Sequence, residues 1–585
     1  MFKIQNSKFK IQVGILLLFA QFFACKEMTD MQNVQPDSKT VLTSGRAEGS
    51  TNAFRYSGQN PYNIRNVQKA AVVLNRDFTL PAQEIQEYIR FQSLDSLQAQ
   101  QLVADSIKFF PFPLDKPDLQ LDENGYYHSP DNKSWLYAVV PTTYNKPSNL
   151  VYETLDSLYF PKENEGDIEF QAFKQTNNLP AEVLAQEPQQ ITPNWWWWIP
   201  VPIGTRPSGT IRVFDTQLGR AVPLEGARAM AVHFGRIVSA HSDANGRFTI
   251  NQRFLVGSLI TVGFDNWRCR IKQWDTTTGW NLAASIAQLP LPSAIHVHGF
   301  EWFGNLGNIN ITFAGNNQAH YWATLNKAVF EYHRLALADG IGRPGTVTVY
   351  AHWSGDRMNG SSGSAPMLGY AGWTGSWGQL LSDVGQVLPI NVIAQFNLLP
   401  DITIKTQAST LNQAANYADV MQTTFHEMGH ASHYALAGRT FWWLYIPYTV
   451  ANMGYGDDES VGSSLPALAE SWAEFLGRRY SVRYYGALPN GRNDEEQGHI
   501  GRPMQDWWIP YGVFHDMVDN TNINEPPPPY PRRIIDNVNG FAPWQLYTHL
   551  TPFTHSPQAF KFSFSNTFGV NQRVPINNLF DSYGY

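Results

Sequence analysis

The chain has 585 residues, enough for several domains with large hydrophobic cores. Hydrophobic residues make up 43% of it and charged residues 16%, which is typical of a folded globular protein and excludes an intrinsically disordered chain. The net charge is −7 and there is no basic run, so the sequence offers no electrostatic footprint for a nucleic-acid partner.

The first residues have the pattern of an export signal. Lys3, Lys8 and Lys10 precede an apolar segment, residues 11–24, that is short for crossing a bilayer. The following Ala24-Cys25 step resembles a bacterial lipobox, which implies cleavage before Cys25 and a lipid anchor on its sulfur. We therefore expect residues 1–24 to be a signal peptide. The mature protein would be an exported lipoprotein of the bacterial outer membrane or cell surface, attached to the membrane through Cys25.

Two segments without recognisable chemistry follow the export signal. Residues 25–70 are rich in Ser, Thr, Asn, Gln and Gly and have few apolar anchors, which predicts a flexible tether. Residues 71–190 have a mixed pattern, with a helix predicted over 81–101 and a strand over 135–140. We expect an N-terminal α/β region of unknown role there.

A run of tryptophans, Trp195–Trp198, stands between prolines. Neighbouring side chains diverge on helices and strands alike, so these indoles cannot all face one core. Packing between domains is the favoured interpretation, and stacking on sugar rings or contact with a membrane are the alternatives.

Short alternating runs fill residues 205–275. Residues 211–214, 229–232 and 247–250 alternate as strands do, and the turn signal Asp243-Ala244-Asn245-Gly246 precedes the last of them. With Pro223-Leu224-Glu225-Gly226-Ala227, these runs resemble a carboxypeptidase regulatory-like, transthyretin-type β-sandwich. The resemblance implies a spacer or accessory binding domain that brings no catalytic residues. Cys269 is expected to be buried on a strand rather than to act as a nucleophile.

The remaining residues, 290–585, hold the candidate chemistry. A helix is predicted over 317–338, strands over 346–351, 391–396 and 401–406, and a helix over 417–436 that should stop near Gly438.

This last helix carries His426-Glu427-Met428-Gly429-His430, the H-E-x-x-H pattern. Two histidines four positions apart share a helix face and are about 6 Å apart along the axis, so both rings can bind one zinc ion. Glu427 is placed as the base that takes a proton from water activated by the metal. His433 is on the same face but about 10 Å beyond His426, which predicts a packed neighbour rather than a ligand.

A third ligand is expected from the segment Leu468-Ala469-Glu470-Ser471-Trp472-Ala473-Glu474-Phe475-Leu476. It resembles the L-x-E-x-aromatic-A-x-aromatic-L element of gluzincin metallopeptidases. The resemblance implies that Glu470 completes a zinc site with His426 and His430, and that Glu474 orients a ligand histidine. It also implies a zincin-like domain over residues 290–585, with an edge strand that pairs with extended substrate.

Two features of this region leave alternatives open. The gap between His430 and Glu470 is about twice the usual one in these families, so Glu459 within it is an alternative third ligand. A helix predicted over 507–520 carries Tyr511 and His515 one turn apart, and either is a candidate for stabilising an oxyanion. The aminopeptidase motif G-x-M-E-N does not occur, so an exopeptidase is not supported.

The sequence thus predicts a multidomain α+β protein, in which a transthyretin-like sandwich precedes a zincin-like catalytic domain. The function expected is that of a zinc-dependent endopeptidase acting on proteins or peptides. One alternative is a non-catalytic surface binding lipoprotein, an adhesin or a glycan-capture protein, with a degenerate zincin domain. Another is a metallopeptidase directed at mucin-type glycoproteins.

Overall fold

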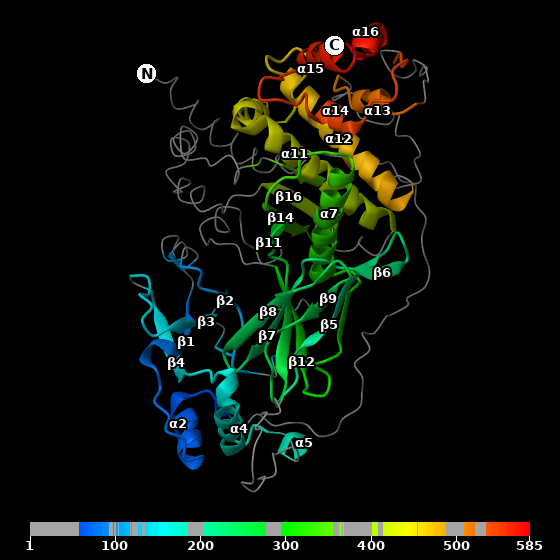
Figure 1. Ribbon diagram of the computed structural model, residues 1–585. Helices are drawn as coiled ribbons and strands as arrows, with labels where there is room; N and C mark the ends of the chain where they lie inside the picture. Colours follow the sequence, from blue (N-terminus) through cyan, green and yellow to red (C-terminus); the bar gives the residue numbers. More distant parts are fainter. Residues whose placement is uncertain are drawn as a thin grey trace, which may run out of the picture.

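The structure is a computed structural model. The residues that it describes, with short gaps inside the first, fourth and sixth ranges, are 58–184, 204–275, 294–354, 362–367, 401–407, 414–486, 508–520 and 534–585. Cys25, the Trp195–Trp198 run and the strand predicted over 391–396 lie outside them. The described residues form a mixed α and β architecture with several separate sheets, as expected (Figure 1). None of the described helices combines the length and the apolar character needed to cross a bilayer.

The N-terminal sheet is antiparallel, with strand order β2-β3-β1-β4. Its strands are β1 (Gln86–Phe91), β2 (Phe109–Phe110), β3 (Leu136–Pro141) and β4 (Tyr152–Leu158). The strand predicted over 135–140 is confirmed as β3, but the helix predicted over 81–101 is wrong, because β1 runs through it. Since β1 is a central strand paired on both sides, this long-range pairing outweighs the local preference for helix.

The tether predicted over 25–70 ends earlier than expected. Tyr62 is buried at 1% exposure, and helix α2 (Ile64–Val73) packs against α4 (Gly166–Gln175). Asn63 caps α2 by accepting the N–H of Arg65, and the core face of the helix consists of small and branched apolar residues. Residues 58–70 therefore belong to the folded protein.

Two further sheets pack face to face over a common core. The first has the order β12-β10-β7-β8 and the second β13-β5-β6, and β9 pairs with the beginning of β5, beyond the part that pairs with β6. Their strands are β5 (Ser208–Asp215), β6 (Arg220–Pro223), β7 (Arg228–His233), β8 (Arg236–His241), β9 (Arg247–Thr249), β10 (Ser258–Gly263), β12 (Ile295–Glu301) and β13 (Ile309–Phe313). On β7, Ala229 and Ala231 face this core, whereas Met230 and Val232 face a second core shared with the N-terminal aromatic residues. The central strands β7 and β10 are therefore buried on both faces.

The fourth sheet carries the helices of interest. β11 (Cys269–Asp275), β14 (Val347–Ser354) and β16 (Ile402–Gln407) are parallel, and β15 (Ser362–Ser364) pairs antiparallel with β16 at the edge. Helix α7 (Gln318–Ala338) packs against β11 and β14, while α11 (Ala414–Ala451) packs against β15 and β16 (Figure 1). The helix predicted over 317–338 is confirmed as α7, which Asn317 caps.

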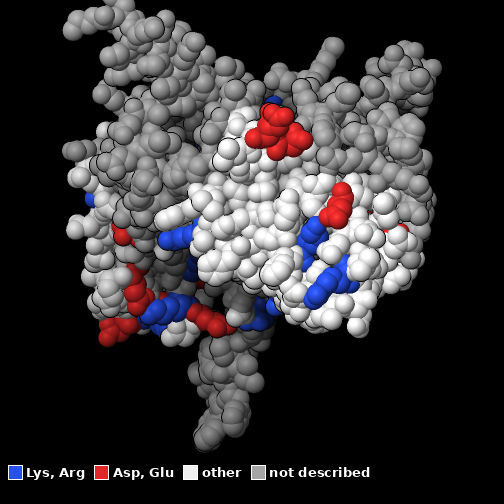
Figure 2. Space-filling model, turned by 90° about the horizontal axis from the view of Figure 1, so that it is seen from above, with Lys and Arg blue, Asp and Glu red and all other residues white. Residues whose placement is uncertain are grey.

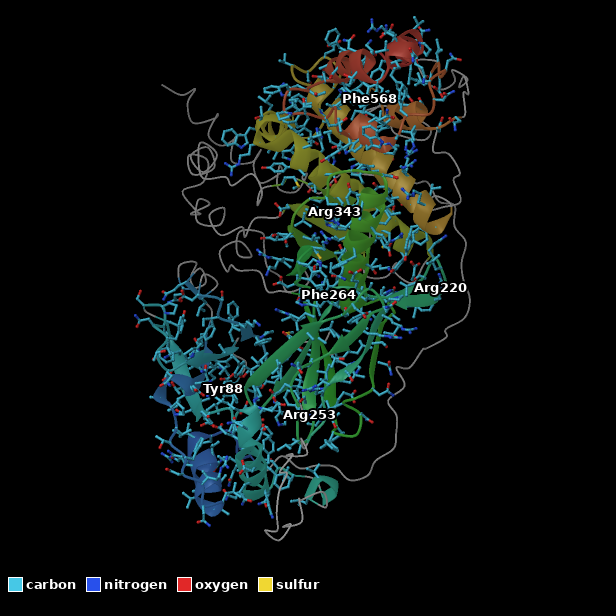
Figure 3. The ribbon with its side chains drawn as sticks, viewed as in Figure 1. Tyr88, Arg220, Arg253, Phe264, Arg343 and Phe568 are labelled. Atoms are coloured by element: carbon cyan, nitrogen blue, oxygen red, sulfur yellow. The ribbon has the colours of Figure 1, made fainter. Side chains whose placement is uncertain are left out.

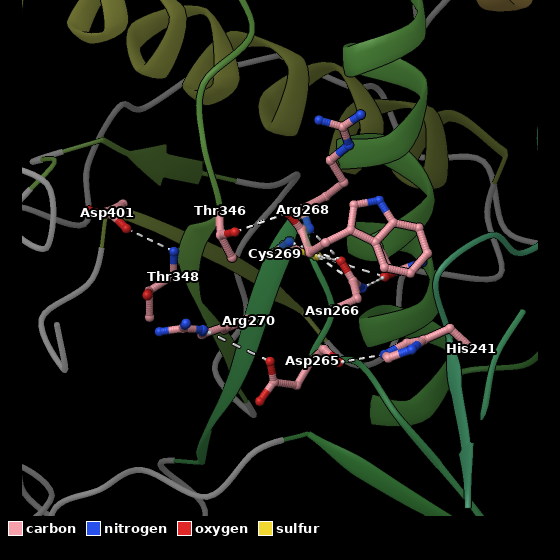
Figure 4. A network of polar contacts seen from close by, with 11 residues as sticks. His241, Asp265, Asn266, Arg268, Cys269, Arg270, Thr346, Thr348 and Asp401 are labelled. Atoms are coloured by element: carbon pink, nitrogen blue, oxygen red, sulfur yellow. Dashed lines mark hydrogen bonds and ion pairs between the residues drawn. The ribbon is translucent and has the colours of Figure 1, made fainter. Parts of the chain in front are cut away.

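The sheets do not divide where the sequence places the boundary between sandwich and catalytic region. β11, inside the range 205–275, joins the parallel sheet, whereas β12 and β13, inside 290–585, complete the two facing sheets. A network of polar contacts at the start of β11 links this part of the chain to α7 (Figure 4). Asn266 accepts the N–H groups of Arg268 and Cys269 and donates to Asn326 of α7 at 2.8 Å. Cys269 is buried, as expected, and burial raises the pKa of its thiol to about 12.

Aromatic packing joins the two facing sheets to helix α7. Phe264, which lies close to α7 in Figure 3, packs against Phe313 of β13 and Trp322 of α7.

The C-terminal helices are α13 (Val513–Val518), α14 (Pro543–Tyr547), α15 (Pro557–Thr567) and α16 (Arg573–Ser582). The helix predicted over 507–520 is thus shorter than expected. Seen from above, the described surface at this end of the molecule shows few charged side chains (Figure 2).

Candidate metal centre

Helix α11 begins before Tyr417 and presents a buried apolar stripe that includes Met421, Phe425 and Met428, which confirms the helix predicted from the spacing. Gly438 adopts φ 63° and ψ −163°, so the regular helix stops there as expected. It then resumes, which was not expected. The second half turns back and packs Phe441, Trp442 and Tyr445 beside the histidine face.

Helix α12 (Ser464–Tyr485) lies very close to the histidine turn of α11. A Cβ atom at Gly429 would be 3.0 Å from Cα of Ala473, and one at Gly477 would be 3.1 Å from Cβ of His426. The side chains at the crossing are therefore as small as the contact allows. This close approach brings Glu470 of α12 to the rings of α11.

The side chains of His426, Glu427 and His430 place ligand atoms within 4.8 Å of one another, so this group could hold a metal ion. The carboxylate of Glu470 completes it: its Oε2 lies 3.3 Å from Nε2 of His426, and its Oε1 lies 3.3 Å from Nε2 of His430. Metal–ligand bonds of about 2.0–2.2 Å give a tetrahedral site ligand–ligand distances of about 3.3–3.6 Å.

The distances and the donor types therefore fit a small divalent cation. Nε2 of His426 is also buried, and its 3.3 Å contact with Glu470 does not have the geometry of a hydrogen bond. A buried nitrogen lacking such a bond is costly unless another group satisfies it. The residues present thus suit a bound metal better than a purely structural cluster.

Charge is distributed unevenly over these ligands. Burial lowers the pKa of His426, but the neighbouring carboxylates of Glu470 and Glu474 outweigh it, so that pKa lies well above its usual range. Burial raises the pKa of Glu470, yet the contacts with His430 and His426 outweigh it and hold that pKa below its usual range. Burial lowers the pKa of His430. The ionised carboxylate of Glu470 therefore favours a positive charge beside the two rings.

Glu427 lies under the edge strand. It is 1% exposed, and a Cβ atom at Gly363 of β15 would be only 2.4 Å from its Oε1. Burial raises the pKa of Glu427 to about 8, with His426 acting against this and Glu470 adding to it. Its Oε2 has no hydrogen-bond partner among the described residues. The carboxyl group can therefore exchange a proton near neutral pH.

Glu474 holds the ring of His426 in place. Its Oε2 lies 3.2 Å from Nδ1 of His426, and its Oε1 accepts a hydrogen bond of 2.5 Å from Nε of Arg478, one turn further along α12. With Nδ1 engaged, the ring presents Nε2 to the centre. The contact expected for Glu474 is present. Arg478 was not anticipated, although its position four residues later on a helix could have suggested it.

Tyr445 contacts Glu470, and the sequence did not predict this contact. Its hydroxyl donates a hydrogen bond of 2.7 Å to Oε1 of Glu470, and its ring stacks on that of His430 with centroids 6.4 Å apart. The aromatic run 441–445 is visible in the sequence, but the turn at Gly438 that folds it back is a tertiary feature.

The other candidates lie elsewhere. Glu459 is exposed in the loop before α12, whereas Glu470 occupies the position beside the rings. Tyr511 packs with Trp508, Ile509 and Ala467 in a separate small cluster. His515 packs against Phe475 at 4.9 Å, behind α12. His433 is buried against Phe441 and Trp442, as expected for a packed residue. The structure thus brings four predicted residues together: His426, Glu427, His430 and Glu470.

No protein-family model, curated protein or solved structure matches this chain.

Proposed function

We propose that this protein is a zinc-dependent endopeptidase, held at the bacterial envelope by a lipid on Cys25 and acting on proteins or peptides. The observation that carries the proposal is the position of Glu470, 3.3 Å from Nε2 of both histidines of the H-E-x-x-H turn. Two imidazoles and one carboxylate are a donor set that catalytic zinc sites use, with a fourth position left for water or substrate.

His426, His430 and Glu470 would hold the zinc ion. When bound, zinc supplies a Lewis acid that polarises a carbonyl group and makes water more acidic. Glu474 keeps the His426 ring oriented for this role because it engages the other ring nitrogen, and Arg478 in turn donates a hydrogen bond to Glu474.

Glu427 would act as the general base and then as the general acid. Its carboxylate takes a proton from the attacking water and delivers it to the nitrogen of the leaving amine. Glu427 is suited to hold a proton between these two steps, since burial is the main cause that raises its pKa. The charge of a bound cation acts in the opposite direction and favours the carboxylate that begins the cycle.

The edge strand supports an extended peptide as substrate. β15 pairs with β16 on one side and ends the described sheet, and its Gly363 lies directly against Glu427. A peptide that adds to such an edge gains backbone hydrogen bonds irrespective of its sequence. Its scissile bond would then lie close to the proposed base, an arrangement that favours cleavage within a chain.

The variant Glu427→Gln tests the proposal, with Glu459→Gln as a matched control from the exposed loop. We expect zinc-loaded wild-type protein to cleave a broad substrate such as casein. Glu427→Gln should retain zinc while losing about 10²–10⁴-fold in rate, and Glu459→Gln should retain both. Full activity of Glu427→Gln, or a wild type that binds no zinc, would contradict the proposal. Mucin with and without its glycans separates a general endopeptidase from one directed at glycoproteins.

A further inference from the structure

The hydroxyl of Tyr445 stands at the centre described above, yet the proposed mechanism leaves it without a role. The residue lies in the second half of α11, beyond the interruption at Gly438, and is 7% exposed. Its ring is fixed by Trp442 at 5.6 Å and Phe441 at 6.0 Å, as well as by the stack on His430. Such packing restricts the ring and leaves its polar end at the ligands.

The hydrogen bond of Tyr445 goes to one particular oxygen. Oε1 of Glu470, which accepts it at 2.7 Å, is the same oxygen that lies 3.3 Å from Nε2 of His430. The hydroxyl therefore bonds directly to Glu470, a proposed metal ligand, and it contacts the same oxygen that lies beside His430. A small movement of the phenol would allow the hydroxyl to donate instead to another oxygen at this centre.

Peptide hydrolysis requires a donor at this place. Negative charge develops on the carbonyl oxygen as water attacks, and a preorganised hydrogen bond to that oxygen lowers the barrier. Glu427, Glu470 and Glu474 carry carboxylates, which accept hydrogen bonds when ionised. A tyrosine hydroxyl carries a proton that it can donate in a hydrogen bond, so Tyr445 supplies what the ionised carboxylates cannot.

We propose that Tyr445 is a catalytic residue whose hydroxyl rests on Glu470 and donates to the developing oxyanion of the substrate. This inference rests on the proposed endopeptidase function. It gives Tyr445 the role for which the sequence had suggested Tyr511 or His515. No covalent bond to Tyr445 forms or breaks, because its hydroxyl only exchanges one hydrogen-bond acceptor for another.

The test is Tyr445→Phe in the full-length protein, with Tyr448→Phe as a matched control. Tyr448 lies on the same helix and also loses one hydroxyl, which there donates to the backbone oxygen of Tyr455 at 2.7 Å. We expect Tyr445→Phe to lower kcat on a fluorogenic peptide about 10²–10³-fold. KM and zinc affinity, the latter measured by competition with a chromophoric chelator, should change little. Binding of a phosphinic peptide, which carries a tetrahedral anionic centre, should weaken together with kcat.

Three results would overturn the inference. The first is a Tyr445→Phe variant that matches the wild type in kcat and phosphinate binding. The second is a zinc affinity that falls about 10–100-fold together with kcat, which would make Tyr445 a residue that positions Glu470. The third is a Tyr448→Phe variant that loses as much activity as Tyr445→Phe, which would assign the effect to the helix. A zinc-loaded wild type that neither cleaves peptides nor binds the phosphinate would overturn the endopeptidase proposal, and this inference with it.

Discussion

Gly363 of the edge strand offers the sharpest test of how β15 and the H-E-x-x-H turn work together. Substituting alanine adds one methyl group on the side of β15 that faces α11. The φ of Gly363 is not in the left-handed region, so the backbone accepts alanine without strain. The consequence of Gly363→Ala therefore comes from the space around the new methyl group.

That space is already filled by the proposed base. The new Cβ would be 2.4 Å from Oε1 of Glu427, 2.7 Å from its Cγ and 2.8 Å from its Cδ. Ordinary contact between such atoms needs about 3.5 Å, so the carboxylate must move by about 1 Å. A displacement of that size at a reacting group can cost about 10²-fold in rate. The three nearest atoms to the new Cβ all belong to Glu427 and none to the proposed zinc ligands His426, His430 and Glu470.

We therefore expect Gly363→Ala to lower kcat/KM about 10²-fold while zinc content stays at the wild-type level. Steady-state cleavage of a fluorogenic peptide and metal analysis of the same samples measure both quantities. Ser364→Ala is the control, because the next side chain on a strand points to the opposite face. Unchanged activity of Gly363→Ala would refute the reasoning. A parallel loss of zinc would also refute it, since the contact would then act on the ligands.

Two further predictions concern the folded scaffold. Burial lowers the pKa of His233 to about 3, below the value of about 6.5 in an unfolded chain, so the unfolded state takes up a proton first and stability falls as pH drops below about 6.5. Between pH 6 and pH 5 the wild type should lose roughly 1 kcal/mol more than His233→Phe in urea unfolding, and equal losses would contradict the assignment. Because burial also raises the pKa of Cys269 to about 12, a Cys25→Ser variant should not react with a thiol reagent until it unfolds. Rapid labelling of the native protein would show that Cys269 is accessible.

Much of the candidate centre could be predicted from the sequence, because its main parts are local. Two histidines four positions apart share a face on any helix, and the stripe of Met421, Phe425 and Met428 identifies that helix. The same holds for Glu470 and Glu474, which are one turn apart on α12. This periodicity depends only on residues that are close together in the sequence, so it can be recognised without knowledge of distant contacts.

What the tertiary structure decided depends on segments far apart in the sequence. β1 forms a strand because β3 and β4 pair with it. β11 belongs to the parallel sheet, and not to the two facing sheets, because it pairs with β14. The contact of Gly363 with Glu427 joins a strand edge to a helix face, and the hydroxyl of Tyr445 reaches Glu470 because the chain turns at Gly438. Periodicity fixes which way a side chain points from its own element. Only packing between elements fixes what it meets there, because that depends on the path of the whole chain.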